Sequence, residues 1–418
     1  MKSVRHLITT ATSDTKVIVV GAGPAGVSLA YLLASRGISV TLLERHQNFT
    51  REFRGEVLLP SGLEALQQMG LGDVVTSIPH IVPTAFELYA NARQMFRIRL
   101  HSESFGSHPL TVLSQPTFLK AVIESARTFP HFRVELGVTV SDLLRTDGRV
   151  EGVTVSSQTG RQTLRSDLVV GADGRNSAIR RACDLDVHKH GIDLDVVWFK
   201  MPLPAFLGGQ TTIRGYVGRG HLLFAYASAD GLFQVGWVIT KGTYGELRRR
   251  GTSEWVEEMA CHVTADLRAH LRTHSHSLTN PFLLSTVSDR VASWSVPGAL
   301  VIGDAAHTMS PVGGQGINIA LRDAIVAANQ LVPVLRQTRS RERIDAATQA
   351  IEHERTPELA RIQRLQAIPP RLLMSHTWWG AAFRATVPRL LRFEAVRERT
   401  APVISPILFG HGDVRLQV

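Results

Sequence analysis

Three glycines in a G-x-G-x-x-G pattern, Gly21, Gly23 and Gly26, are the first residues whose spacing suggests chemistry. They follow the β-branched run 16–20 and precede a stretch of strong helix formers, so they occupy a strand-to-helix turn. The first glycine permits the tight bend, the second lets a pyrophosphate approach the backbone, and the third lets helix and strand pack closely. Glu44, eighteen positions after Gly26, is placed to bind a ribose hydroxyl. The pattern predicts a dinucleotide site.

A second segment, residues 167–178, combines a short strand with an Asp-Gly turn. The strand would deliver Asp173, Gly174 and Arg175 to an edge of the sheet, and Ser177 could cap a following helix. Two interpretations stay open here. Asp173 either contacts the nucleotide or bonds its own backbone at an ordinary strand–turn–helix corner.

A third segment begins with the apolar run 299–302 and continues as Gly-Asp-Ala-Ala-His, followed by a glycine-rich turn. Asp304 lies at the predicted strand end, where its carboxylate could bind a ribityl or ribose hydroxyl. Gly314 and Gly316 leave backbone N–H groups open at the start of the next helix, which suits an anion or an electron-rich ring edge. We interpret His307 as a structural hydrogen-bonding residue rather than a base.

The elements that would position these segments predict an α/β protein. Residues 16–44 form one βαβ unit in which a helix joins two parallel strands. Further zones of regular structure follow in order: strands over 132–174, strands over 184–240, helix over 244–272, strand over 299–302 with a helix over 317–331, and, after residue 336, helices interrupted by Pro357 and later prolines.

Composition narrows the function classes. A chain of 418 residues suggests two or three domains. Two cysteines exclude a disulfide scaffold and a four-cysteine zinc site, and they favour a reducing compartment. The net charge of +10 is not gathered into a basic block with interleaved aromatic residues, so nucleic-acid binding is not expected. Without an apolar run of membrane-spanning length or a signal peptide, we expect a cytoplasmic protein.

In this order and separation, the three segments resemble the class A flavoprotein monooxygenases, the para-hydroxybenzoate-hydroxylase-like family. The resemblance covers most of residues 15–330. It implies an α/β fold with a Rossmann-like FAD-binding domain, an inserted β-sheet substrate domain and C-terminal helices. We therefore expect these parts: FAD-binding residues 1–75, 105–183 and 286–335, substrate-domain residues 76–104 and 184–285, and a helical region over 336–418.

The resemblance also implies individual residue roles. Arg54 matches an arginine near the flavin and pyrophosphate, and is a possible catalytic group; no other catalytic residue is assigned. Gln115 opens the helix that contacts FAD, Val138 would lie near the adenine, and Asp173 would serve FAD and nicotinamide together. The ADP half of FAD would be held by Gly21, Ala22, Gly23, Pro24, Ala25, Gly26, Glu44 and Arg45. The ribityl chain and isoalloxazine would lie along Gly303, Asp304, Pro311, Gly314, Gln315, Gly316 and Ile317.

In this family reduced flavin reacts with O₂ to give a C4a-(hydro)peroxide, which hydroxylates or epoxidises an organic substrate. The resemblance implies one non-covalent FAD, no metal, and NADPH or NADH as a transient co-substrate, because no second complete G-x-G-x-x-G unit is present. We expect an apolar, aromatic small-molecule substrate. Candidate contacts in the alternating middle segment are His221, Phe224, Gln234 and Trp237.

Two alternatives remain. One is a sister flavoenzyme, either a prenyl-chain reductase or a halogenase; the chain has no W-x-W motif and no lysine between Lys16 and Lys120, which argues against halogenation. The other is a non-catalytic protein that binds FAD or a lipid surface. Lipid would be bound by residues 372–409, where paired tryptophans lie beside arginines. Prolines and glutamates interrupt that segment, so we expect structural helices rather than membrane association.

Overall fold

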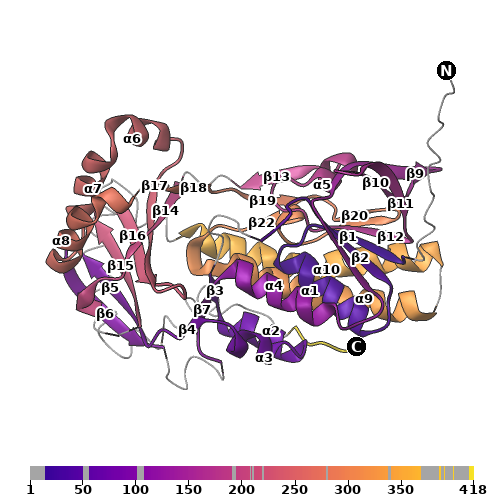
Figure 1. Ribbon diagram of the computed structural model, residues 1–418, viewed down its shortest axis with the longest axis horizontal. Coiled ribbons are helices and arrows are strands. Elements are labelled where there is room, and N and C mark those ends of the chain that lie inside the picture. Colours follow the sequence, from indigo (N-terminus) through magenta and orange to yellow (C-terminus); the bar gives the residue numbers. More distant parts are fainter. Residues whose placement is uncertain are drawn as a thin grey trace.

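The computed structural model describes residues 15–49, 56–100, 108–190, 194–207, 209, 211–218, 221–278, 281–337, 340–368, 386, 390, 399 and 414–418. The molecule is elongated and has two lobes (Figure 1). The first lobe is built on a six-stranded sheet and the second lobe on a seven-stranded sheet. The predicted α/β architecture is confirmed.

The six-stranded sheet of the first lobe is mainly parallel. Its order is β20-β21-β12-β1-β2-β8, and only the β20–β21 pair is antiparallel. The central strands are fully buried apolar runs, as parallel strands covered on both faces require. The strands are β1 (Val17–Val20), β2 (Val40–Glu44), β8 (Phe132–Leu136), β12 (Leu168–Gly171), β20 (Ser295–Val296) and β21 (Ala299–Val301).

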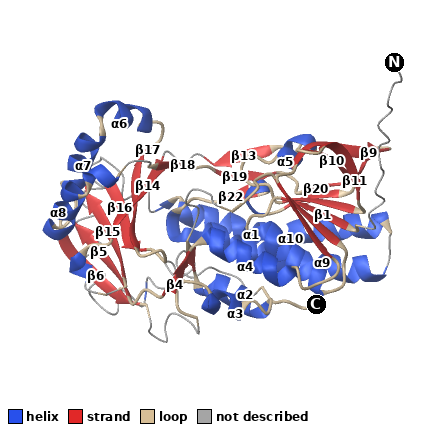
Figure 2. Cartoon of the chain, viewed as in Figure 1, coloured by secondary structure: helices blue, strands red, loops and turns tan. Residues whose placement is uncertain are grey.

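Two layers cover this sheet (Figures 1 and 2). Four helices pack together on one side, and a three-stranded antiparallel sheet in the order β11-β10-β9 lies on the other. The strand order places β1, β12 and β21 side by side, so their carboxyl ends share one edge. The helices are α1 (Pro24–Ser35), α4 (Gln115–Ala126), α9 (Gln315–Gln337) and α10 (Arg341–Gln366), and the strands are β9 (Thr139–Thr146), β10 (Arg149–Ser157) and β11 (Gly160–Arg165).

Pro357 does not interrupt the last of these helices. The sequence predicts a break there, whereas α10 continues on both sides of the proline to Gln366. Ile351 and Leu359 are both fully buried in the core of the first lobe, so packing on either side holds the helix together. Tertiary contacts therefore outweigh the hydrogen bond that proline removes. The later prolines, from Pro369 onward, lie outside the described residues.

Smaller elements complete the first lobe. Two three-stranded sheets, in the orders β13-β19-β22 and β3-β7-β4, lie beside the large sheet. β13 falls within the predicted substrate domain, yet it pairs with β19 rather than joining the seven-stranded sheet. The elements are β3 (Val57–Leu58), β4 (His80–Ile81), β7 (Thr111–Leu113), β13 (Val187–His190), β19 (Ser288–Val291), β22 (His307–Thr308), α2 (Pro60–Gln68), α3 (Gly72–Ser77) and α5 (Ala178–Ala182).

The second lobe is one sheet drawn from two separate parts of the chain. Its order is β18-β14-β17-β16-β15-β5-β6, and only the β15–β5 pair is parallel. The predicted helical zone after residue 244 is three helices, because Gly251 has φ +89° and separates α6 from α7. The elements are β5 (Ala85–Ala90), β6 (Arg93–Arg99), β14 (Leu194–Pro202), β15 (Thr212–Gly218), β16 (His221–Ala227), β17 (Leu232–Thr240), β18 (Phe282–Ser285), α6 (Tyr244–Arg250), α7 (Thr252–Ala260) and α8 (Ala265–Thr273).

The two faces of the seven-stranded sheet have different neighbours. Helices α6, α7 and α8 cover the outer face, away from the first lobe (Figure 1). That face buries Leu223, Val235 and Trp237 in one core with the helices. The alternate positions, including Leu222 and Val238, form a separate cluster on the inner face. Period-two alternation therefore assigns each side chain to one of two environments.

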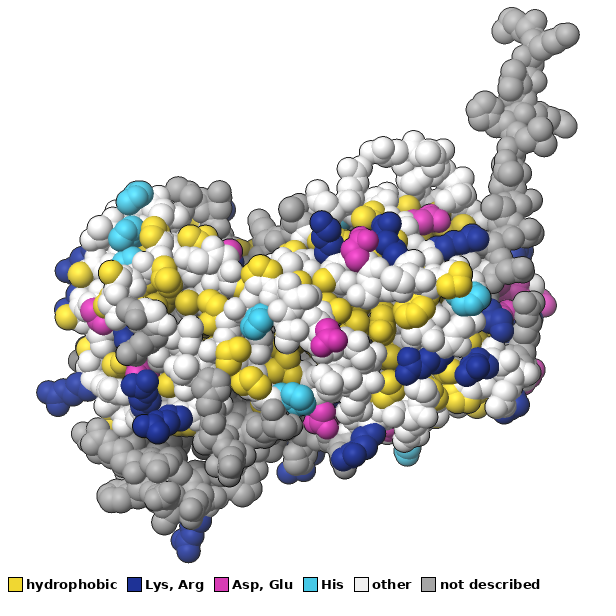
Figure 3. All heavy atoms as spheres, turned by 60° about the horizontal axis from the view of Figure 1, so that its bottom comes forward, with side chains coloured by type: hydrophobic (Ala, Val, Ile, Leu, Met, Phe, Trp, Pro, Cys, Tyr) yellow, Lys and Arg dark blue, Asp and Glu magenta, His cyan; other side chains and the backbone are white. Residues whose placement is uncertain are grey.

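Two observations bear on charge and membranes. Figure 3 shows basic side chains scattered over one side of the molecule among acidic and apolar ones, rather than gathered into a block. None of the helices in the described part of the chain has both the length and the apolar character to cross a membrane.

A buried carboxylate, Asp195, holds the connection between the lobes. One oxygen of Asp195 accepts from Gly242 N at 3.0 Å; the other accepts from Thr286 N at 3.1 Å and lies 3.3 Å from Lys241 Nζ. The side chain of Asp195 is only 3% exposed. Two backbone N–H groups from separate segments, at Gly242 and Thr286, therefore depend on this carboxylate, while Lys241 Nζ also donates to Thr286 O at 2.5 Å.

We expect Asp195→Ala to lower the free energy of unfolding by about 2–4 kcal/mol, because it leaves the N–H groups of Gly242 and Thr286 without an acceptor. Denaturant unfolding of purified protein measures this. Glu124→Ala is the control: its exposed ion pair with Arg127 spans 3.6 Å, and removing it should cost less than about 0.5 kcal/mol. Equal stability of Asp195→Ala and wild type would contradict the assignment.

Candidate functional site

The three sequence motifs meet at the carboxyl ends of β1, β12 and β21. Gly21 has φ +103°, and a Cβ added there would lie 2.4 Å from the carbonyl oxygen of Ala172. A Cβ at Gly303 would lie 2.9 Å from the Cβ of Ala25. Only glycine permits these approaches, so the glycines join all three motifs into one site.

The first motif leaves an open backbone at the start of α1. A Cβ at Gly23 would have its nearest neighbour at 3.9 Å, whereas one at Gly26 would lie 2.0 Å from Gly21 O. No side chain caps α1 and its first turn has no acidic residue; Pro24 and Ala25 begin the helix. A pyrophosphate can therefore reach the free N–H groups and the positive end of the helix dipole.

Glu44 ends β2 beside this turn. Its Oε2 accepts from Ala22 N at 2.8 Å and its Oε1 from His46 N at 3.0 Å, so the carboxylate is fixed in place. Val138 is buried next to it, and its N–H donates to Glu44 O at 2.9 Å. This arrangement places a carboxylate and an apolar side chain where a ribose and an adenine would lie.

The remaining residues expected around the ADP half are less constrained. Gln115 is the first residue of α4 and is half-buried. Arg45 is exposed, and its Nε lies 3.1 Å from His46 Nε2. Arg54 lies outside the described residues.

Asp173 caps α5. Its Oδ1 accepts from Ser177 Oγ at 2.5 Å, and its Oδ2 accepts from the N–H groups of Ala178 at 2.6 Å and Ile179 at 3.3 Å. The structure thus shows the strand–turn–helix interaction, which was the other interpretation of this residue. Its neighbour Arg175 is the one whose side chain extends toward the third motif.

Asp304 is accessible at the end of β21. Its side chain is 37% exposed, and its Oδ2 lies 3.5 Å from Arg175 Nε. Arg175 also donates to Ser285 O at 3.0 Å, on the connection to the second lobe. A partly exposed carboxylate with one long ion pair retains acceptor positions for ligand hydroxyl groups.

Asn318 organises the glycine-rich turn before α9. Its Nδ2 donates to Gly314 O at 2.9 Å and to Val57 O at 3.3 Å, while its Oδ1 accepts from Leu59 N at 2.9 Å. Gly314 has φ +62°, and its N–H donates to Pro311 O at 3.0 Å, so the expectation of an open N–H at Gly314 is wrong. A Cβ at Gly316 would meet no atom within 4 Å.

Near the turn, the side chains of Gln315 and Ile317 are buried in α9, so the backbone rather than these side chains faces outward. Asn318 is not among the site residues predicted from the sequence. The one feature that could have indicated its role is a polar residue on the apolar side of a predicted helix.

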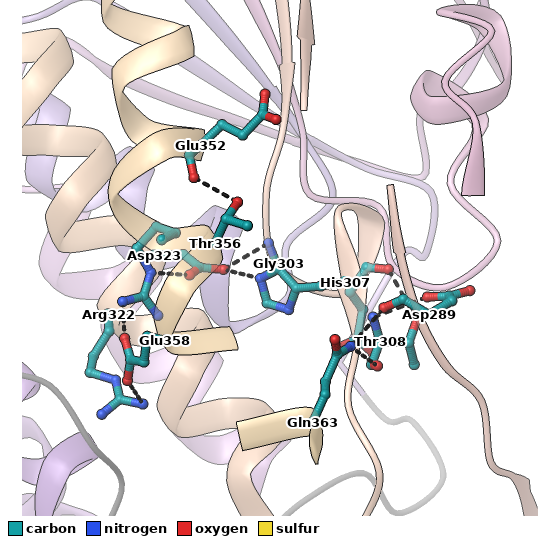
Figure 4. A network of polar contacts seen from close by, with 12 residues as sticks. Asp289, Gly303, His307, Thr308, Arg322, Asp323, Glu352, Thr356, Glu358 and Gln363 are labelled. Atoms are coloured by element: carbon teal, nitrogen blue, oxygen red, sulfur yellow. Dashed lines mark hydrogen bonds and ion pairs between the residues drawn. The ribbon is translucent and has the colours of Figure 1, made fainter. Parts of the chain in front are cut away.

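A buried polar network fixes the Gly-Asp motif from behind (Figure 4). Asp323, on α9, is fully buried. Its Oδ2 lies 2.7 Å from His307 Nε2 and accepts from Gly303 N at 3.1 Å, and its Oδ1 accepts from Arg355 Nε at 2.8 Å. Burial alone would raise the pKa of Asp323, but His307 and Arg355 outweigh it and lower that pKa to about 2. His307 therefore has the structural role that the sequence indicated.

The network continues along α10. Arg355 also pairs with Glu358, whose Oε1 lies 2.6 Å from Arg322 Nη2. Burial lowers the pKa of Arg322 to about 10, so it stays charged at neutral pH. Farther along, Gln363 Nε2 donates to Asp289 O at 2.9 Å and Thr308 O at 3.3 Å. No local sequence pattern marks this network, because its members lie on separate elements, with Asp323 16 residues from His307 and 32 from Arg355.

The four candidate substrate contacts fall on opposite faces of the second lobe. Trp237 is 1% exposed on the helix-covered face and its ring stacks on Trp255 at 6.1 Å. His221 stacks on His262 of the same core at 4.4 Å. Phe224 and Gln234 lie on the inner face, at alternate positions to these core residues. The structure does not bring the four together, because adjacent strand positions point to opposite sides.

The inner face carries partly exposed aromatic rings. Trp198 lies over Gly236, where an added Cβ would be 2.6 Å from the indole ring. Phe224 passes over Gly215, whose Cβ would lie 3.6 Å from the ring edge. Both rings are half-buried, so each still offers apolar surface to a ligand. The glycines let these rings lie flat on the sheet.

The residues present fit a bound FAD. The open backbone at Gly23 and the uncapped start of α1 fit a pyrophosphate, and the open backbone at Gly316 fits the flavin ring. The Glu44 carboxylate fits a ribose hydroxyl, and the accessible Asp304 carboxylate fits a ribityl hydroxyl. Within the described ranges, no group of three or more His, Cys, Asp or Glu side chains could hold a metal ion. Fold and site together define a flavoprotein with a second lobe built on its own sheet.

Residues 14–363 match the family of FAD binding domains, and the chain belongs to that family. It is 31% identical over 407 residues to 6-methylpretetramide 4-monooxygenase of Streptomyces rimosus, a match that covers 97% of this chain and 94% of the relative. It is 28% identical over 346 residues to 3-(3-hydroxy-phenyl)propionate/3-hydroxycinnamic acid hydroxylase of Paraburkholderia xenovorans, covering 81% of this chain and 53% of the relative.

Among solved structures, p-nitrophenol 4-monooxygenase of Pseudomonas putida is similar in fold. The TM-score is 0.79 at 18% sequence identity, over 95% of this chain and 99% of that one. The predicted membership of the class A FAD-dependent monooxygenases is confirmed by the family and its relatives. The protein is an FAD-dependent enzyme with a Rossmann-like cofactor domain.

We expect Asp304→Ala to bind FAD about ten- to a hundredfold more weakly while the fold survives. A hydrogen bond from a ligand hydroxyl to a carboxylate contributes about 1.5–3 kcal/mol. Fluorescence titration of apoprotein with FAD measures this, with exposed Asp73→Ala on α3 as the control. His307→Ala should weaken FAD binding less. Unchanged FAD affinity together with unchanged turnover in Asp304→Ala would contradict the assignment.

Proposed function

We propose that this chain is a single-component monooxygenase that uses FAD, NADPH or NADH, and O₂ to hydroxylate a flat aromatic substrate. One oxygen atom of O₂ enters the product, the other becomes water, and NAD(P)H supplies the two electrons. One observation carries the proposal: the turns of the first lobe fit FAD, and the inner face of the second lobe carries aromatic rings. Epoxidation of an apolar substrate is the related outcome.

Bound FAD would supply the redox and oxygen chemistry, and the protein supplies binding, orientation and exclusion of water. The turn at Gly21–Gly26 would hold the pyrophosphate, Glu44 the ribose and Asp304 the ribityl chain. The turn held by Asn318 would present backbone N–H groups to the flavin ring. We retain Arg54 as a possible group at the flavin and Arg175, which bonds toward both lobes, as a candidate for contact with nicotinamide.

The substrate class rests on the inner face and on the relatives. Trp198 and Phe224 offer half-exposed rings, and Phe86 lies beside Gly215, where an added Cβ would be 3.4 Å from its ring. Flat aromatic substrates stack on such surfaces. The relative that matches nearly the whole chain acts on 6-methylpretetramide, and other similar proteins act on a hydroxy-phenyl compound and a nitrophenol. We therefore propose a phenol of more than one ring, with Phe224 and Gln234 retained as contacts.

The alternatives have less support. The similar proteins reported above are named as monooxygenases or a hydroxylase, not as reductases or halogenases. Lipid docking through 372–409 concerns a segment of which only residues 386, 390 and 399 are described. Both cysteines, Cys183 and Cys261, are free, which supports a reducing compartment and our proposal of a cytoplasmic location.

We expect the purified protein to carry one FAD per chain, held without a covalent bond, and to oxidise NADPH or NADH faster when a polycyclic phenol is added. Acid precipitation should release all the yellow colour into the supernatant, and mass spectrometry should show a product 16 mass units heavier, roughly one oxygen atom. Colour left in the pellet would contradict non-covalent binding. NAD(P)H consumption that no phenol, indole or polyketide-like aromatic stimulates would contradict the monooxygenase proposal.

A further inference from the structure

A buried glutamate lies where the two lobes meet. Glu56 immediately precedes β3 and is 6% exposed. The next residue, Val57, contacts the flavin-facing turn: its carbonyl accepts from Asn318, and its Cβ lies 3.8 Å from the position of a Cβ at Gly314. Glu56 is therefore one residue away from the turn expected along the flavin ring.

The carboxylate of Glu56 reaches across to the inner face of the second lobe. Its Oε1 lies 3.2 Å from Lys200 Nζ, on β14, and Lys200 Nζ lies 2.7 Å from Asp230 Oδ2. Lys200 is two positions from Trp198 on the same strand, so both side chains belong to the inner face. The other oxygen, Oε2, is buried, and no described residue donates a hydrogen bond to it.

The ion pair with Lys200 engages Oε1 and leaves Oε2 without a donor among the described residues. Asp230 already neutralises Lys200, because it accepts from Lys200, Ser228 Oγ and Leu232 N. A buried carboxylate oxygen without a donor costs free energy that the fold must offset elsewhere. Such an orphaned acceptor at a ligand-binding face points to a donor that the ligand brings.

The surroundings of Glu56 allow it to change protonation near neutral pH. Burial raises its pKa to about 7, with Lys200 opposing the shift and Asp230 adding to it. Tyr226, on β16, is buried nearby; burial first, and the charge of Glu56 second, raise its pKa well above the usual value. Among described residues, Lys200, Asp230 and Tyr226 are the titratable groups that act on Glu56.

We propose that Glu56 is an acid–base residue of the substrate site, whose free Oε2 takes the proton of a phenolic hydroxyl on the bound aromatic substrate. This inference rests on the proposed function, and it assigns a residue that none of the three sequence motifs contains. Ionising the phenol makes its ring more electron-rich and so a better target for an electrophilic oxygen.

The proton step balances without a redox partner. The substrate O–H bond breaks and the Glu56 Oε2–H bond forms, which leaves a phenolate and a neutral carboxyl. To leave, the proton needs a rotation of the Glu56 carboxyl that turns its protonated oxygen toward Lys200 Nζ, which contacts the other oxygen at 3.2 Å. Lys200 then passes a proton to Asp230 as it receives one from Glu56, and Asp230, whose side chain is 45% exposed, releases it to water. A phenol held near Glu56 could thus exchange its proton with solvent while the ring stays covered.

The substitution Glu56→Gln should raise stability at pH 8 while it lowers activity. Because the folded pKa of Glu56 lies above its unfolded value, the folded state binds more protons between about pH 4.5 and 7, and stability falls as pH rises through that window. Glu56→Gln removes this penalty. Its melting temperature should therefore exceed that of wild type at pH 8 and match it at pH 5, whereas loss of a stabilising ion pair would lower it at pH 8.

The first test uses FAD-loaded enzyme without substrate. A pH titration followed by infrared difference spectroscopy should show a buried carboxyl that titrates near pH 7 in wild type and not in Glu56→Gln. Glu87→Gln is the matched control, since Glu87 is buried on the same sheet but pairs with Arg214 on the helix-covered side. Absence of the Glu56 signal in wild type overturns the proposal, whatever the enzyme's activity.

The second test measures NAD(P)H consumption with alizarin, a planar polycyclic phenol, as the probe. In wild type, kcat should rise with pH through about 7. In Glu56→Gln, kcat should fall by about 10²–10⁴-fold with little change in KM, and the rise of kcat with pH should disappear. Glu56→Asp should restore part of the rate, and Glu87→Gln should keep the wild-type profile. An unchanged kcat in Glu56→Gln overturns the proposal. A wild type inactive with alizarin counts against the polycyclic-phenol part of the proposed function and leaves the infrared result to decide Glu56.

Discussion

The buried carboxylate of Asp323 is the contact on which the geometry of the cofactor site depends. It joins three elements that are far apart in the chain: the Gly303 turn after β21, helix α9, and Arg355 on helix α10. Its bond to His307 fixes the other end of the same turn. Asp304 lies between Gly303 and His307, so Asp323, which is itself fully buried, fixes the direction of the accessible Asp304 side chain. Because Asp323 is fully paired, a charge can be buried there without a large desolvation penalty.

Glycines are the second feature that fixes the geometry of the cofactor site. Gly21 and Gly303 allow backbone contacts between motifs that any side chain would prevent. On the second lobe, Gly236 does the same for Trp198, because an added Cβ would lie 2.6 Å from the indole ring. The residues that fit FAD thus present backbone fixed by buried ion pairs, while the inner face of the second lobe presents aromatic rings. The ion pair between Glu56 and Lys200 connects the first lobe to the inner face of the second lobe.

Much of this arrangement could be predicted from the sequence because the relevant physics is local. A β-branched run, a glycine-rich turn and a helix-forming stretch specify a strand–turn–helix unit whatever the rest of the chain does. The three segments therefore indicated the α/β fold, the FAD site, the position of Glu44 at a strand end and the structural character of His307. The alternation in β16 and β17 likewise predicted two faces, and the structure contains both.

Only the tertiary structure decided which partner each side chain meets. Asp173 accepts from Ser177 and from the first N–H groups of α5, and Trp237 belongs to the face covered by helices rather than to the inner face. α10 runs through Pro357 because packing on both sides holds it. Asp323 and Glu56 carry no local pattern; each acquires its role from residues far away in the chain. Sequence spacing determines the turns that glycine permits, whereas long-range packing determines burial, and burial sets the charge and reactivity of an acidic side chain.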